Sequence, residues 1–196
     1  MELLLIRHGL PVRIDDAGGP ADPELAEEGW DQARRLVRWL AEEGVDAVYA
    51  SPMLRARQTA EPLAGELGLE VVIDEEIAEF DREAHYYVPI EELKAAKDER
   101  WYRLAAGEFE FSEVDPETFR KIVVGAVERI IAANQSRRVA VFCHGGVVNA
   151  YVSHILGIAR PLFFEPHYTS ISRVVAARTG ERSIVSLNET AHLRET

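Results

Sequence analysis

The sequence predicts an α/β fold in which helices cover both faces of a mainly parallel sheet. Short apolar runs rich in β-branched residues occur at 3–6, 46–50, 71–73 and 138–143, as expected of strands buried on both faces. Segments with helical periodicity separate these runs, which favours a three-layer sandwich. With 196 residues, 47% of them apolar, the chain suits one well-buried domain spanning residues 1–196.

The first predicted helix lies in the segment PELAEEGWDQARRLVRWLAEEG. Pro23 suits the first helical turn, apolar residues from Trp30 to Leu40 recur on one stripe, and Gly44 suits the end of the helix. Three more helices have similar signals. They are expected at about 53–67 before Gly68, at about 116–134, and at 147–156 before Gly157. Near the end of the chain, Thr179 and Gly180 between two β-rich runs predict a hairpin.

The segment from about 74 to 115 breaks the alternation of strand and helix. It contains YYVPIEELKAAKDERWYRLAAGEF and predicts one or two short helices on long loops, as a lid-like insertion over the active site. Residues 74–99 carry ten Asp or Glu against three Lys or Arg, a poor wall for a polyanion.

Composition excludes several classes of protein. The formal charge of −12 argues against binding to nucleic acid or to an anionic membrane surface, which require a basic face. The single cysteine, Cys143, rules out an internal disulfide and lies in an apolar run. Because the sequence has no membrane-span or signal-peptide pattern, we expect a cytoplasmic protein.

Polar residues follow three of the predicted strands. The first strand ends in Arg7, His8 and Gly9, the second runs into SPMLRARQTAE, and the fourth ends in His144 and Gly145. If these strands are parallel neighbours, the side chains meet at one edge of the sheet beside two helix N-termini, where ligands of α/β proteins bind. The pattern predicts an anion site with arginine forks suited to phosphate.

These motifs resemble those of the histidine phosphatase superfamily, also called the phosphoglycerate mutase-like family. The resemblance rests on RHG after the first strand, SPMLRARQTAE after the second and HGG after a later strand, and PELAEEGWDQA and LNETAHL extend it past residue 190. It implies the phosphoglycerate mutase-like fold and phosphomonoester hydrolysis. In SPMLRARQTAE the family's arginine corresponds to Arg55, which leaves Arg57 an outer role.

Carried onto this sequence, the resemblance makes His8 the nucleophile that forms a phosphohistidine. Arg7, Arg55 and His144 would surround the phosphoryl group, and Glu79 would be the proton donor. The same interpretation uses neither a metal nor a cofactor.

Elementary chemistry supports this division of roles. A neutral His8 can attack phosphorus if its other ring nitrogen donates to a carbonyl such as that of Gly9, and flanking cations would lower its pKa. His144 would serve best if protonated. The backbones of Gly9 and Gly145 could approach the phosphate closely. His167 either lines the pocket or is an ordinary surface-loop histidine.

Several functions remain open at this level. The expected substrate is a small-molecule phosphomonoester with a neutral or cationic remainder, and inorganic phosphate is the product. Aromatic residues of the insertion could contact a ring-bearing group of the substrate; they are Phe80, Tyr86, Tyr87 and Trp101. The alternatives are mutase-type phosphoryl transfer, a phosphohistidine-protein phosphatase and a non-catalytic phosphate-binding module. Cysteine-based phosphatase chemistry is disfavoured because Asn149 stands where its arginine would be. A homodimer is also left open.

Overall fold

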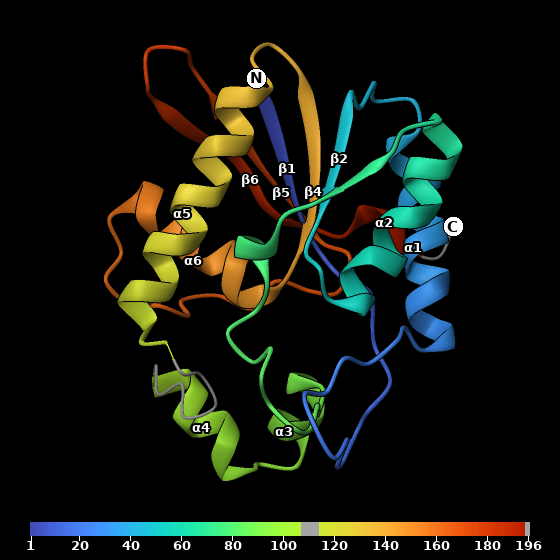
Figure 1. Ribbon diagram of the computed structural model, residues 1–196, viewed down its shortest axis with the longest axis vertical. Helices are drawn as coiled ribbons and strands as arrows, with labels where there is room; N and C mark the ends of the chain where they lie inside the picture. The colour runs from blue at the N-terminus through green and yellow to red at the C-terminus, as the bar shows by residue number, and fades with distance from the viewer. Residues whose placement is uncertain (107–113, 195–196) are drawn as a thin grey trace.

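A single mixed sheet forms the centre of the protein in the computed structural model, which describes residues 1–106 and 114–194 (Figure 1). The strand order is β3-β2-β4-β1-β5-β6, with β1 to β4 parallel to one another and β5 and β6 antiparallel. The strands are β1 (Glu2–Arg7), β2 (Ala47–Ala50), β3 (Val71–Ile73), β4 (Arg138–Cys143), β5 (Ile171–Ala176) and β6 (Arg182–Glu189). The predicted mainly parallel sheet and its terminal hairpin are confirmed.

Helices pack on both faces of this sheet, so the three-layer architecture is confirmed as well (Figure 1). One face carries α1 (Glu27–Leu40) and α2 (Leu54–Leu67), and the other carries α5 (Pro116–Ala133) and α6 (Gly145–Leu156).

The alternating side chains of β1 show why the strand must lie in the middle. Leu3 and Leu5 pack with α5 and α6, whereas Leu4 and Ile6 pack with α1 and α2. All four side chains are fully buried, and each contributes about 1.5–3 kcal/mol to stability. The apolar residues of β1 therefore fill the centre of the fold, and its polar last residue, Arg7, lies at the carboxyl end of the strand.

The first helix begins later than its sequence signals predict, at Glu27 rather than near Pro23. The preceding residues are extended because they pair with the loop after β1. Leu25 forms a bridge with Pro11, and the Ala26 backbone N–H donates to the carbonyl of Leu10 at 2.9 Å. Helix α6 differs in the opposite direction, because it begins at Gly145, two residues before its predicted start.

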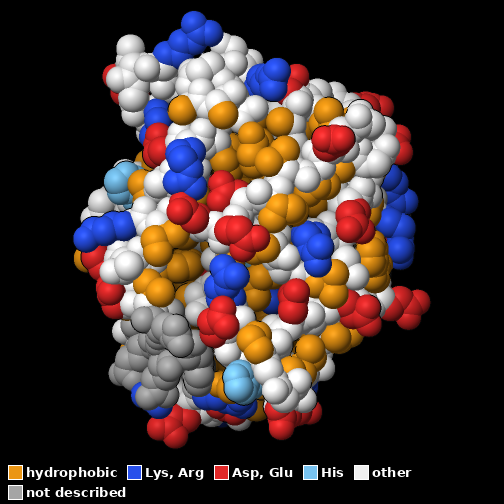
Figure 2. Space-filling model, viewed as in Figure 1, with side chains coloured by type: hydrophobic (Ala, Val, Ile, Leu, Met, Phe, Trp, Pro, Cys, Tyr) orange, Lys and Arg blue, Asp and Glu red, His pale blue; other side chains and the backbone are white. Residues whose placement is uncertain are grey.

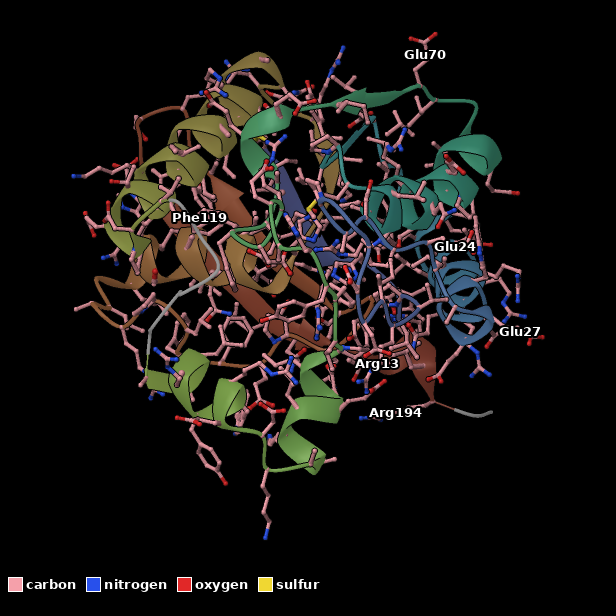
Figure 3. The ribbon with its side chains drawn as sticks, turned by 60° about the horizontal axis from the view of Figure 1, so that its bottom comes forward. Arg13, Glu24, Glu27, Glu70, Phe119 and Arg194 are labelled. Carbon is pink, nitrogen blue, oxygen red and sulfur yellow. The ribbon has the colours of Figure 1, made fainter. Side chains whose placement is uncertain are left out.

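The two short helices of the predicted insertion lie at the carboxyl ends of the parallel strands, at the bottom of Figure 1. The described part of the insertion holds a 3₁₀ turn, η1 (Glu75–Ile77), and these two short helices, α3 (Ile90–Ala95) and α4 (Glu99–Ala106). Residues 107–113 of the predicted insertion lie outside the described residues. Figure 3 shows Arg13, from the loop after β1, beside α3, where its guanidinium donates to Glu92 at 3.1 Å.

Charged side chains of both signs are interspersed over the face of the molecule seen in Figure 2. Among the described residues, no helix has both the length and the apolar character needed to cross a bilayer. Because the protein has a net charge of −12, binding of an anionic ligand depends on a few local cations.

Candidate active site

The polar ends of β1 and β4 lie next to each other at the carboxyl edge of the sheet. The two strands pair in parallel register, with Arg7 opposite Cys143, and the His8 backbone N–H donates to the Cys143 carbonyl at 2.9 Å. The rings of His8 and His144 are consequently 5.1 Å apart between centroids. The structure thus brings together residues that are 136 positions apart in the sequence.

The tautomer of His8 follows from its hydrogen bonds. Nδ1 lies 2.8 Å from the Gly9 carbonyl oxygen, which can only accept, so Nδ1 carries the proton. The other nitrogen, Nε2, is therefore unprotonated, and its lone pair accepts a hydrogen bond from Arg55 Nε at 3.3 Å. This is the arrangement that the sequence predicted from the neighbouring glycine.

The pKa of His8 lies well below its ordinary value. Burial is the largest cause, followed by the positive charges of Arg55 and Arg7. The two arginines were foreseen as the cause, but removal from water contributes more. The imidazole is neutral near pH 7 and keeps its lone pair available.

Arg7 and Arg55 are buried, with exposed fractions of 7% and 1%, and residues from distant segments of the chain hold them in place. Arg7 donates through Nη1 to the Glu91 carboxylate at 3.0 Å and to the Pro166 carbonyl at 2.7 Å. Its guanidinium also lies 3.8 Å above the ring of Tyr168.

Arg55 has a comparable pair of partners from the insertion. It donates to Asp81 at 3.2 Å and lies 4.7 Å from the centre of the Tyr87 ring. Arg57, two residues later on α2, is exposed. The sequence motif therefore identified the inward-facing arginine but not the residues that orient it.

Three buried nitrogens of this cluster lack a hydrogen-bond partner within residues 1–106 and 114–194. They are Arg7 Nε, Arg55 Nη1 and His144 Nδ1. Buried polar groups are normally paired, so three unpaired nitrogens in one place indicate a site for a ligand with several acceptor oxygens.

His144 is fully buried, and its Nε2 forms a hydrogen bond of 2.7 Å with the hydroxyl of Ser51. Burial, followed by the positive charge of Arg55 and that of Arg7, holds its pKa well below the ordinary value. The imidazole is therefore neutral near pH 7, in contrast to the protonated form that would serve best, and a bound dianion would raise its pKa. The Ser51 hydroxyl oxygen also accepts a hydrogen bond from the Met53 backbone N–H at 3.3 Å.

Glu79 is 7% exposed and lines the same cavity as His8. Its two carboxylate oxygens accept backbone N–H groups, Oε2 from Gly146 at 2.7 Å and Oε1 from Phe80 at 3.1 Å. Burial, with the charge of Asp81 second, raises the pKa of Glu79 to about 7. A carboxyl with this pKa can both donate and accept a proton near neutral pH.

Gly9 and Gly145, whose backbones were predicted to approach the phosphate, differ in their surroundings. The Gly9 N–H donates to Thr59 Oγ1 at 2.9 Å, so it is occupied within the protein, and a Cβ here would meet the Gly29 carbonyl oxygen at 2.7 Å. Gly145 does line the cavity, beside Arg7.

His167 lies on the surface and not at the cavity, which corrects its predicted place in the pocket. Its side chain is exposed, and its backbone N–H donates to Asn188 at 2.8 Å. The preceding residue, Pro166, lines the cavity and offers its carbonyl to Arg7.

The cavity above this cluster has a volume of about 250 Å³. Its inner end contains Arg7, His8, Arg55 and Glu79, and its outer end is formed by α3, α4 and the segment 160–166. The arrangement can bind one tetrahedral anion against a nucleophilic nitrogen while a carboxyl group exchanges a proton.

The chain belongs to the histidine phosphatase superfamily (branch 1), whose family model matches residues 3–190. This confirms the resemblance stated from the motifs, and the hydrolase class predicted from them agrees with the relatives. A putative phosphoserine phosphatase 2 from Hydrogenobacter thermophilus is 28% identical over 98% of each chain. A phosphoserine phosphatase from Entamoeba histolytica, solved with 3-phosphoglyceric acid, superposes with a TM-score of 0.76 at 25% identity and covers 98% of this chain and 99% of that one. A 2,3-bisphosphoglycerate-dependent phosphoglycerate mutase from Methylorubrum populi is 31% identical over 71% of each chain.

Proposed function

We propose that the protein hydrolyses small phosphate monoesters through a phosphohistidine formed on His8. The observation that carries the proposal is the unprotonated His8 Nε2 beside a buried cluster of donor nitrogens that lack partners among the described residues. These nitrogens suit the oxygens of one phosphoryl group.

In the first half-reaction, His8 Nε2 attacks phosphorus, and the N–P bond forms as the ester P–O bond breaks. Arg7, Arg55 and His144 bind the three equatorial oxygens. Glu79 in its protonated form gives its proton to the leaving oxygen, which a pKa of about 7 allows at neutral pH. The alcohol then departs.

In the second half-reaction, the Glu79 carboxylate removes a proton from water, whose oxygen attacks the phosphohistidine. The N–P bond breaks, its electron pair returns to His8 Nε2, and inorganic phosphate leaves. One ester and one water thus give one alcohol and one phosphate. The proposal requires neither a metal nor a cofactor.

The hydrogen bond between Ser51 and His144 suggests which ring nitrogen of His144 binds the phosphoryl group. If the Ser51 hydroxyl donates to Nε2, the ring proton lies on Nδ1, the nitrogen without a partner in the described structure. Nδ1–H would then donate to a phosphoryl oxygen.

The charges around the cavity favour hydrolysis over mutase-type transfer. A mutase must hold a second anionic group of its substrate, yet Arg100, which lines the cavity beyond Arg7 and Arg55, is engaged by the carboxylate of Asp98 at 2.7 Å. Phosphoserine and 3-phosphoglycerate, named for the relatives, are candidate substrates to test. Release of phosphate from 3-phosphoglycerate, without formation of 2-phosphoglycerate, would support the phosphatase over the mutase.

Trapping of the intermediate tests the proposal directly. The protein is mixed with ³²P-labelled ester and quenched in alkaline detergent, because a phosphohistidine survives base. We expect label on the wild type and none on His8→Ala. His167→Ala, which changes an exposed histidine outside the cavity, is the matched control and should keep both label and turnover. Hydrolysis without label would overturn the mechanism, and phosphate binding without label or product would favour a non-catalytic module.

The single domain, the cytoplasmic location and the homodimer stay predictions. Light scattering of the purified protein measures its oligomeric state, and one protomer per particle would exclude the dimer.

A further inference from the structure

The cavity has two parts of different chemistry. The inner part is the charged cluster around His8. The outer part is lined by apolar and aromatic side chains of the insertion and of the segment after α6, namely Tyr87, Leu93, Trp101, Leu104, Leu162 and Phe163. An organic group attached to a phosphoryl group at His8 has to lie in this outer part.

Charged side chains at the outer part already have partners within the protein. Arg100 donates to the carboxylate of Asp98 at 2.9 and 2.7 Å. Arg160 donates to the Ala105 carbonyl at 2.5 Å, which leaves its positive charge without a carboxylate partner among the described residues. Glu165 is paired with Lys94 at 2.9 Å.

A second anionic group on the substrate would therefore find Arg160 as a counter-charge there, while Arg100 is already neutralised by Asp98. It would also face the carboxylates of Asp81 and Glu165, which line the cavity. An uncharged apolar group, in contrast, gains from leaving water for the aromatic wall.

We propose that the substrate is the monophosphate ester of a small, uncharged, ring-bearing alcohol. The inference rests on the proposed function of the inner part and specifies what the outer part recognises. The cavity volume of about 250 Å³ is below the range of about 300–1,000 Å³ common for drug-sized ligands, which limits the organic group to about one ring.

The comparison of benzyl phosphate with ethyl phosphate tests the inference. The two leaving alcohols have similar acidity, so a difference in kcat/KM reports the fit of the organic group and not its leaving ability. We expect benzyl phosphate to be favoured about 10²-fold, from burial of one apolar ring. Phosphoserine and 2,3-bisphosphoglycerate should be poorer substrates than benzyl phosphate because they carry extra charge.

Two pairs of variants locate the preference in the outer part. Trp101→Ala should reduce kcat/KM for benzyl phosphate about 10-fold and leave ethyl phosphate nearly unchanged. Trp39→Ala, on the exposed surface of α1, is the matched control. Leu162→Lys adds a cation to the outer wall and should shift preference towards 2,3-bisphosphoglycerate, whereas the control Leu156→Lys changes an exposed leucine at the end of α6.

The outcomes separate this inference from the proposed function. Equal kcat/KM for benzyl and ethyl phosphate, equal behaviour of Trp101→Ala and Trp39→Ala, or phosphoserine as the best substrate would overturn the inference. Label on His8 in those experiments would leave the phosphatase mechanism intact. Absence of both label and hydrolysis with every ester would overturn the two together.

Discussion

Replacing Glu79 with glutamine removes a titrating group from the cavity with little change in shape. Burial first and the charge of Asp81 second raise the pKa of this carboxyl from 4.5 to about 7. The difference corresponds to about 3 kcal/mol, at roughly 1.4 kcal/mol per pH unit.

The sign of the stability effect follows from where the proton is held more tightly. The folded state retains it up to about pH 7 and the unfolded state only to about 4.5, so the contribution is fully present below pH 4.5 and is lost as the pH rises through 7. From about pH 4 to about pH 8, the Glu79→Gln variant should therefore gain about 3 kcal/mol in free energy of unfolding relative to the wild type. The constant cost of exchanging an oxygen for an amide group cancels in this difference.

Urea unfolding followed by circular dichroism at the two pH values measures this effect. Glu75→Gln, at an exposed carboxylate of the same segment, is the matched control and should show no such change. A stability difference between Glu79→Gln and the wild type that is the same at both pH values would refute the raised pKa.

The proposed role of Glu79 in proton transfer predicts a dependence on the leaving group. For ethyl phosphate, whose alkoxide leaves poorly, kcat/KM should fall about 10²–10⁴-fold in Glu79→Gln. For p-nitrophenyl phosphate, which releases a stable phenolate, the loss should be much smaller. Equal losses with the two esters would contradict the role as proton donor.

Two further substitutions test the phosphoryl cluster and its packing. Arg55→Lys keeps the charge but loses the planar fork of the guanidinium, so kcat should fall about 10²–10³-fold. The control Arg57→Lys, on the exposed side of α2, should leave kcat unchanged. Similar kcat values for the two variants would argue against Arg55 as a ligand of the phosphoryl oxygens. Gly146→Ala places a Cβ 2.2 Å from Glu79 Oε1, so the buried carboxyl must move, and we expect a stability loss of about 1–3 kcal/mol by thermal unfolding together with reduced turnover. Unchanged stability and turnover in that variant would show that the carboxyl is free to move.

The convergence at the site could be predicted because it depends on a general property of parallel sheets. Strands that are apolar on both faces must lie in the middle of the sheet, and their carboxyl ends share one edge. His8 and His144 therefore had to meet once their strands paired. The same rule applied to Ser51 would have indicated its contact with His144, since Ser51 directly follows β2.

The residues that hold the arginines could not be predicted in this way. Asp81, Glu91 and Tyr87 belong to the insertion, where no periodic pattern determines the path of the chain. The position of His167 could not be predicted for a related reason: in an irregular loop, composition does not show which of two adjacent residues faces the cavity.

The start of the first helix shows how tertiary contacts override local signals. Pro23 is a sound helix-start residue, but the backbone N–H of Leu25 donates to the side chain of Gln58 on α2, and that of Ala26 donates to the carbonyl of Leu10. Signals that act within one turn of the chain do not report such contacts.

The insertion departs from β3, a strand at the border of the sheet, while the phosphoryl cluster stands on the central strands β1 and β4. A segment attached at the border can be lengthened, shortened or exchanged without rethreading the middle of the fold. The first part of the insertion nevertheless carries Glu79 and the residues that hold Arg7 and Arg55, so an exchange that changes the preferred alcohol has to retain residues 79–91. Helix α4, which contributes Trp101 and Leu104 to the cavity, is therefore the part of the insertion where selectivity can change while bond cleavage is kept.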